Sequence, residues 1–207
     1  MEDQWLAWAK RLQALASTGL YFTDAEYDRE RYAEVAEIAN AMLAGLGDVP
    51  IDRIAELVPD FAQGYATPLI DVRGAVFSGN QILLVRERAD GFWTMPGGYA
   101  DVGLSAAQNV EKEISEEAGL EVKARRLYCV RHKAKHAYRP DIRDFYKMFF
   151  ICESLGEAPP SPGTETTEVA YFDTDALPEL SSGRTIAADV AEAVAHRDDP
   201  RRSVVFD

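Results

Sequence analysis

One stretch, residues 97–122, constrains this chain more than any other part of it; it reads GGYADVGLSAAQNVEKEISEEAGLEV. Its second half has a helical pattern, because Val110 and Ile114 form an apolar stripe one turn apart. Ser105 is a candidate N-cap just before the periodic residues, and Gly119 is a candidate stop. The stretch therefore predicts a loop that leads into an amphipathic helix.

Three carboxylates share one face of that helix. Glu113, Glu116 and Glu117 stand at positions i, i+3 and i+4, which bring their side chains together about one turn apart. Left alone, these charges would repel one another, and a divalent hard cation removes that cost, because Mg²⁺ accepts carboxylate oxygens and keeps waters that it can share with a phosphate. The pattern predicts a metal-binding helix, and the alternative is a solvated acidic face.

The same residues resemble the signature of the Nudix hydrolases, Gly-x5-Glu-x7-Arg-Glu-U-x-Glu-Glu-x-Gly-U, in which U is aliphatic. Seven of the nine defined positions agree, and the segment before them, with Trp93, Met95 and Pro96, looks like the strand and loop that enter the signature. The matching residues are Gly98, Glu113, Ile114, Glu116, Glu117, Gly119 and Leu120.

This resemblance implies a fold and a metal site. The fold is a Nudix α/β/α sandwich with a mixed sheet over residues 65–207, preceded by a small all-helical domain over residues 1–64. The resemblance also implies that the metal is Mg²⁺, with Mn²⁺ as a possible substitute. Its implied ligands are the carboxylates of Glu113, Glu116 and Glu117 and the backbone carbonyl of Gly97.

Two positions depart from the signature. Lys112 replaces arginine, which keeps the positive charge but loses the planar fork that holds a carboxylate by two parallel bonds. Leu104 replaces glutamate and removes one carboxylate from the loop. A Nudix-fold nucleotide-binding regulator with weakened turnover is therefore an alternative to an active hydrolase.

Composition limits the partners. The chain has 207 residues, of which 47% are hydrophobic, and its formal net charge is −13, which disfavours nonspecific binding to nucleic acid or membranes. No apolar run approaches the ~20 residues of a membrane span, and the acidic, amphipathic N-terminus is unlike a secretory signal. The two cysteines form no framework of pairs. We expect a cytoplasmic protein.

A local excess of positive charge lies between Lys123 and Lys147, with nine Lys or Arg against two Asp. Such a segment could draw a diphosphate toward the metal, which makes Arg131 and Lys133 candidate phosphate ligands; solvent-facing charges on a strand are the alternative. Aromatic rings could hold the rest of the substrate by stacking or cation–π attraction. The candidates are Trp93, Tyr99 and Tyr138.

A general base must activate the attacking water. Glu165 and Glu168 are candidates, because they lie in a Pro-, Gly- and Ser-rich segment, residues 153–167 and just beyond, that we expect to be a mobile surface loop. Glu116 or Glu117 is the alternative base.

The N-terminal residues predict three helices. The first carries Trp5, Trp8 and Leu12 and is expected to stop at Gly19; the second ends at Gly45, and a third spans residues 51–58. Three such helices make a thin core, so we expect them to pack on the rest of the chain or on a second subunit in a homodimer.

This N-terminus resembles the extension of the CDP-choline pyrophosphatase-like Nudix enzymes. The resemblance implies hydrolysis of a nucleoside diphosphate linked to another group, CDP-choline above all, to a nucleoside monophosphate and a phosphorylated product. ADP-ribose and the 5′ end of an RNA are alternative substrates.

The remaining pattern predicts strands and one helix. We expect a helix at residues 185–195 and a tail, residues 201–207, that frays or pairs across subunits. The expected strands span residues 70–77, 81–85, 92–95, 122–130, 145–152 and 169–172.

Overall fold

The computed structural model describes residues 2–47, 65–156 and 158–207. The chain divides into two compact units. The smaller contains Met1–Leu69 and Ala134–Phe145, and the larger contains Ile70–Lys133 and Tyr146–Asp207. The expected boundary between residues 64 and 65 falls at the edge of a segment outside the described residues, so it stays a prediction.

The larger unit is built on a mixed seven-stranded sheet with the order β3-β2-β1-β5-β4-β7, and β6 pairs with β2. Strand β7 runs parallel to β4, whereas the β1–β2, β2–β3, β2–β6 and β4–β5 pairs are antiparallel. The strands are β1 (Leu69–Ser78), β2 (Gln81–Glu87), β3 (Trp93–Thr94), β4 (Val122–His132), β5 (Phe145–Ser154), β6 (Thr166–Asp173) and β7 (Val205–Phe206).

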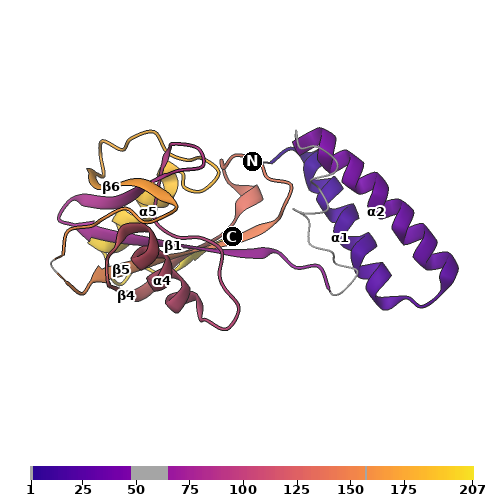
Figure 1. Cartoon of the computed structure of the whole chain (residues 1–207), viewed down its shortest axis with the longest axis horizontal. Coiled ribbons are helices and arrows are strands. Elements are labelled where there is room, and N and C mark those ends of the chain that lie inside the picture. The colour runs from indigo at the N-terminus through magenta and orange to yellow at the C-terminus, as the bar shows by residue number, and fades with distance from the viewer. Residues whose placement is uncertain (1, 48–64, 157) are drawn as a thin grey trace. The chain divides into compact units, whose positions relative to one another are not determined.

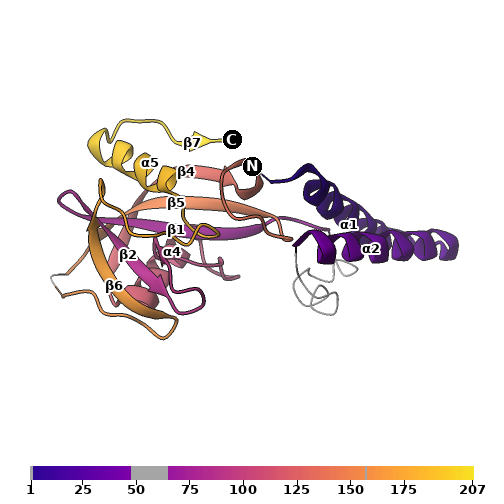
Figure 2. The same ribbon diagram turned by 90° about the horizontal axis from the view of Figure 1, so that it is seen from above.

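Two helices cover this sheet from opposite faces, as the two views in Figures 1 and 2 show. They are α4 (Ala106–Ala118) and α5 (Ala187–Asp198). Val110 and Ile114 of α4 are fully buried and pack on Val72 and Leu83 of the sheet. Gly74 lets the helix approach β1, because a Cβ atom there would lie 2.5 Å from the Ile114 side chain. The predicted α/β/α sandwich is confirmed.

The smaller unit contains a helical hairpin of α1 (Gln4–Phe22) and α2 (Glu26–Gly47). The expected stop of the first helix at Gly19 is wrong, because α1 continues for three residues beyond it. A Cβ atom on Gly19 would lie 2.5 Å from the Tyr32 ring, so this glycine provides room for the partner helix instead of a C-cap. The expected third helix, residues 51–58, lies outside the described residues.

A segment from between β4 and β5 completes the smaller unit. Ile142 packs in one buried cluster with Leu6, Ala9 and Leu43 of the helical hairpin. The Lys10 ammonium donates to Asp144 Oδ1 at 3.0 Å. The sequence did not predict this association, because nothing in the basic segment indicates that its central residues leave the sheet.

Other parts of the larger unit also differ from expectation. Strand β6 begins at Thr166, so the end of the expected mobile loop belongs to the sheet. The C-terminal tail pairs with β4 of its own chain, with Cys129 opposite Val205, rather than fraying or crossing to another subunit. In the described part of the chain, no helix is long and apolar enough to cross a membrane.

Candidate functional site

Helix α4 begins and ends as its residues dictate. Ser105 accepts a hydrogen bond from the Gln108 amide, and the Gln108 side chain accepts one from the Ser105 amide, which satisfies two donors of the first turn. At the other end, Gly119 adopts a left-handed conformation with φ of 64°. These two caps fix which turns of the helix carry the carboxylates.

Glu117 is the most buried of the three signature carboxylates. Its side chain is 7% exposed, and its Oε2 atom accepts a hydrogen bond of 2.8 Å from the amide of Gly97. Burial raises the pKa of Glu117 to about 8, although the charge of Arg73 and the Gly97 amide both act in the opposite direction. The negative charge of this carboxylate is therefore incompletely compensated by the protein alone.

The two glycines before the helix bring the loop against these carboxylates. Gly97 has a φ of 141°, and a Cβ atom there would lie 2.0 Å from the Val72 carbonyl oxygen. A Cβ atom on Gly98 would lie 2.6 Å from Oε2 of Glu113. A side chain at Gly97 would clash with the backbone of strand β1, and one at Gly98 would displace the Glu113 carboxylate, which explains the Gly-Gly entry in physical terms.

Glu113 and Glu116 differ in their surroundings. Glu113 is half-buried, and burial raises its pKa despite the nearby charge of Lys112. Glu116 is exposed and pairs with the Lys112 ammonium at 2.7 Å. Lys112 also lies 3.3 Å from a carboxylate oxygen of Asp101 and 3.8 Å from one of Glu113, so it gathers three carboxylates in place of the arginine fork. Leu104, the other departure from the signature, lies exposed in the loop just before the N-cap.

Sequence reasoning missed a cluster of charged residues next to Glu117. The buried Arg73 guanidinium donates to the Met95 carbonyl at 3.1 Å, and its charge acts on both Glu117 and Glu87. Burial raises the pKa of Glu87, whereas Arg184, 3.1 Å away, and Arg73 lower it. The sequence signal for these two residues was a charge in or next to an expected apolar strand. Arg73 lies within residues 70–77, and Glu87 lies just after residues 81–85.

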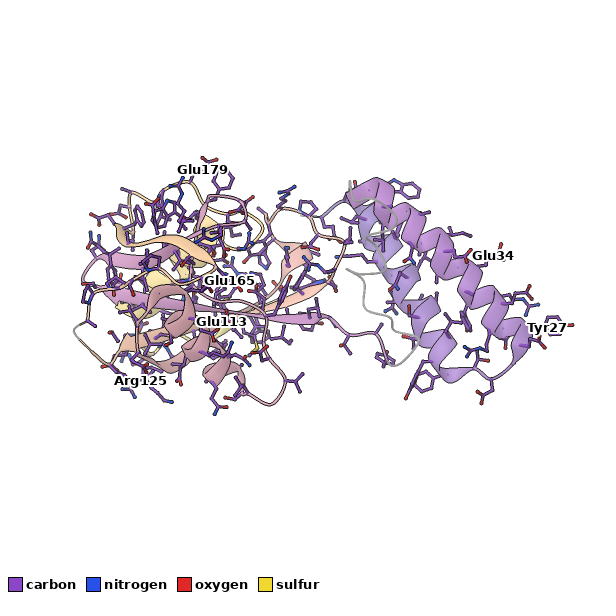
Figure 3. The ribbon with its side chains drawn as sticks, in the orientation of Figure 1. Tyr27, Glu34, Glu113, Arg125, Glu165 and Glu179 are labelled. Atoms are coloured by element: carbon purple, nitrogen blue, oxygen red, sulfur yellow. The ribbon has the colours of Figure 1, made fainter. Side chains whose placement is uncertain are left out.

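The structure separates the two loop carboxylates that we considered as general bases. Glu165 is exposed, and its charge acts on Glu87, which in turn acts on Glu117. Figure 3 labels Glu165 and Glu113 within the larger unit. Glu168 instead pairs with Arg86 at 2.6 Å, and Arg86 lies on the strand face opposite to Glu87. Glu165 is therefore linked electrostatically to the charged residues next to Glu117, whereas Glu168 is held in an ion pair by Arg86.

Two aromatic candidates lie near the signature. Trp93 is half-buried in β3 and packs edge-to-face on Phe172, with ring centroids 4.6 Å apart. Tyr99, directly after Gly98, is 51% exposed and is the residue of this pair whose ring is more accessible to a substrate.

The other three candidates are placed elsewhere. Arg131 is buried and pairs with Asp189 of α5 at 2.8 Å, so its guanidinium is held against the helix on the other face of the sheet from α4. Tyr138 is 5% exposed within the smaller unit. Lys133 begins a short 3-10 helix after β4. The Arg131 guanidinium is thus held in a buried ion pair within the fold and is not exposed to a phosphate.

The signature residues fit a hard divalent cation by their chemistry. Among the described residues, no group of three or more His, Cys, Asp or Glu side chains is already gathered around one point. Glu113 and Glu117 nevertheless flank the Gly97–Gly98 loop, and burial raises the pKa of both carboxyl groups, with a smaller contribution from neighbouring carboxylates. Glu116 would have to exchange Lys112 for the ion. Carboxylate and carbonyl oxygens are the donors that Mg²⁺ prefers.

Two family models match this chain, one in each of its two parts. A model described as "NUDIX domain" matches residues 68–194, and one described as "UDP-X-like, N-terminal oligomerisation domain" matches residues 3–58. The chain is 40% identical over its whole length to a Bacillus subtilis (strain 168) protein named "Putative ADP-ribose pyrophosphatase YjhB", of which it covers 99%.

Two crystal structures are also similar. One, a UDP-X diphosphatase, is 30% identical and has a TM-score of 0.63; the match covers 98% of each chain. The other, an ADP-ribose pyrophosphatase from Streptococcus suis 89-1591, is 38% identical with a TM-score of 0.62, and the match covers 68% of this chain and all of that one.

Proposed function

Because the chain belongs to the Nudix family of pyrophosphohydrolases, we propose that it hydrolyses a nucleoside diphosphate linked to a second group, with a divalent cation bound by α4. Water attacks one phosphorus, the P–O–P bond breaks, and the products are a nucleoside monophosphate and a phosphorylated remainder. The observation that carries this proposal is the buried, incompletely compensated carboxylate of Glu117 against the Gly97 amide.

The residues have separate roles in this proposal. Glu113, Glu116, Glu117 and the Gly97 carbonyl would hold the cation, which would neutralise phosphate charge and lower the pKa of a bound water. Glu165 accepts the proton of the attacking water as general base; its exposure and its electrostatic link to Glu87 support this role. Tyr99 and Trp93 contact the part of the substrate outside the diphosphate.

For the substrate, we favour ADP-ribose and UDP-linked compounds. The relatives whose names carry these substrates match this chain over all or most of its length, and the UDP-X diphosphatase match includes the N-terminal helices. CDP-choline, the substrate suggested by the N-terminal resemblance, is named by none of these relatives. A capped or triphosphorylated RNA is disfavoured, because Arg131 and Lys147 of the basic segment are buried in ion pairs.

We also propose that the chain forms a homodimer through the smaller unit. Four apolar side chains of α1 are spaced at three or four residues and are each at least 39% exposed: Trp5, Trp8, Leu12 and Leu15. Such an apolar stripe on a monomer is a common mark of a protein interface. The match to an oligomerisation domain supports the same assignment.

Glu117→Gln tests the proposed chemistry. Release of nucleoside monophosphate from ADP-ribose, a UDP-sugar and CDP-choline, and of phosphate or pyrophosphate from triphosphorylated RNA, would be measured with Mg²⁺ and with Mn²⁺. We expect kcat on the best substrate to fall by about 100-fold or more in this variant, because the most buried ligand carboxylate is lost. Glu121→Gln, a change at an exposed carboxylate beyond the helix, is the control and should retain wild-type activity.

The same assay separates an enzyme from a nucleotide-binding regulator. A regulator would show a nucleotide-dependent rise in melting temperature without product release. Wild-type turnover by Glu117→Gln would show that the metal face is assigned incorrectly.

A further inference from the structure

The segment that carries Glu165 is fixed to the last turn of α4. The Thr166 hydroxyl donates to the Glu117 carbonyl oxygen at 2.8 Å and accepts a hydrogen bond of 2.9 Å from the Gly163 amide. The Gly163 amide also lies 3.2 Å from the same Glu117 carbonyl. Thr166 is 1% exposed, so these bonds form away from water. One hydroxyl thus joins the two ends of a four-residue segment to the backbone of a signature carboxylate.

Gly163 allows this approach. A Cβ atom at Gly163 would lie 1.7 Å from the Glu116 carbonyl oxygen and 3.3 Å from the Glu117 Cα atom. No side chain can occupy that space without moving the segment off the helix. The contact therefore depends on backbone proximity to the residues that carry two of the three signature carboxylates.

Arg88 holds the same segment from its other side. Its amide donates to the Glu165 carbonyl at 3.0 Å, and its guanidinium donates to the carbonyls of Thr164 and Thr166 at 3.1 and 3.3 Å. Glu165 therefore lies between two anchors, with its backbone fixed and its side chain exposed. This arrangement limits where its carboxylate can be relative to Glu117.

We propose that Thr166 is a positioning residue for hydrolysis, which sets the distance between the base Glu165 and the carboxylate helix through its hydrogen bond to the Glu117 carbonyl. The inference rests on the proposed function. Its physical basis is that a base and the water that it activates must keep a fixed geometry, and a displacement of about 1 Å can cost on the order of 100-fold in rate. The hydroxyl supplies that constraint at the residue next to Glu165.

A double-mutant cycle tests this role. Thr166→Val keeps the shape of the side chain and removes the hydroxyl, while the Glu117 carbonyl keeps its contact with the Gly163 amide. We expect kcat to fall by about 10- to 100-fold with little change in KM, because orientation rather than binding is lost. Thr166→Ser retains the hydroxyl and should restore kcat to near the wild-type value. In a Glu165→Gln background, Thr166→Val should lower kcat by less than about 2-fold, because the group that it positions is already absent.

Controls separate this role from a structural one. Thr167→Val removes the neighbouring hydroxyl, which donates to the Arg86 carbonyl at 3.3 Å, and should leave kcat unchanged. Arg88→Met loosens the segment from its other side and should repeat the pattern of Thr166→Val, so the inference can be tested even if Thr166→Val does not fold.

Several outcomes would overturn the inference. A wild-type kcat in Thr166→Val, or an equal loss of kcat with and without Glu165, would show that the hydroxyl does not act through this carboxylate. Full activity of Glu165→Gln would show that Glu165 is not the general base. It would overturn the inference about Thr166 but would leave the proposed hydrolase function intact. A wild-type protein that hydrolyses none of the four substrates would contradict both.

Discussion

Asp71, Arg73 and Lys147 place one negative and two positive charges inside the larger unit, and all three residues are less than 7% exposed. Asp71 accepts hydrogen bonds from the Arg73 guanidinium at 2.9 and 3.1 Å and from the Lys147 ammonium at 2.6 Å. Burial by itself would raise the pKa of Asp71, but the two cations outweigh it and lower the pKa to about 2. Burial also lowers the pKa of Lys147, to about 8. The carboxylate thus neutralises charges that have no access to water.

Asp71→Asn should therefore destabilise the fold. Removing one partner of a buried ion pair costs about 3 kcal/mol or more, because the remaining charges stay buried without compensation. Urea unfolding at pH 7 measures this change. Glu153→Gln, which breaks the exposed pair with Arg125, is the matched control and should cost less than about 1 kcal/mol. Equal losses of unfolding free energy in the two variants would show that burial does not increase the contribution of the Asp71 ion pair to stability.

The cost of Asp71→Asn should also depend on pH. The pKa of Asp71 is about 2 in the folded protein, below its ordinary value of 3.8, so its contribution is fully present above pH 4. Protonation removes that contribution as the pH falls from about 4 toward 2. The difference in unfolding free energy between wild type and Asp71→Asn should therefore shrink over that interval.

For individual residues, the sequence predicted the candidate site only in part. The spacing of Glu113, Glu116 and Glu117 was sufficient to place them on one helix, because helix geometry is local. Arg73 and Glu87 were missed because they reach Glu117 through the sheet, and no local pattern indicates which strands are neighbours. Arg131 was assigned to phosphate binding because its charge is visible in the sequence, whereas its partner Asp189 is 58 residues away.

Helix α4 is the element on which the site depends, and its start was predicted from sequence. Ser105→Ala removes the acceptor for the Gln108 amide and should lower the free energy of unfolding by about 1 kcal/mol. Ser105→Asp keeps an acceptor at the N-cap and should retain most of the stability. Chemical denaturation of the three proteins measures these differences. A wild-type free energy of unfolding in Ser105→Ala would contradict the capping role of Ser105.

The elements that sequence reasoning placed incorrectly share a physical cause. Gly19 was interpreted as a helix stop, but its missing side chain is used for contact with Tyr32. The tail was expected to fray or to pair across subunits, but it pairs in parallel with β4 of its own chain. In each case, a tertiary contact decides the outcome, and the local preference is too weak to oppose it.

For the whole molecule, the exposed stripe of α1 gives the main prediction. We expect light scattering to give twice the chain mass of 23.0 kDa for the wild type. Trp8→Glu places a charge in the middle of the stripe and should give a monomer, because an uncompensated charge is costly in an apolar interface. Leu155→Glu makes the same change of charge at an exposed apolar residue of the larger unit and should leave the mass unchanged. A monomeric wild type would contradict the proposal.

The association of residues 134–145 with the helical hairpin has a practical consequence for anyone who shortens this protein. A truncation that starts at residue 68, where the match to the conserved hydrolase model begins, would leave Ile142 without Leu6, Ala9 and Leu43. It would also leave Asp144 without Lys10. The isolated fragment would thus expose an apolar, aggregation-prone insertion between strands β4 and β5. Replacing that insertion with a short polar turn is the sounder way to produce the hydrolase part alone.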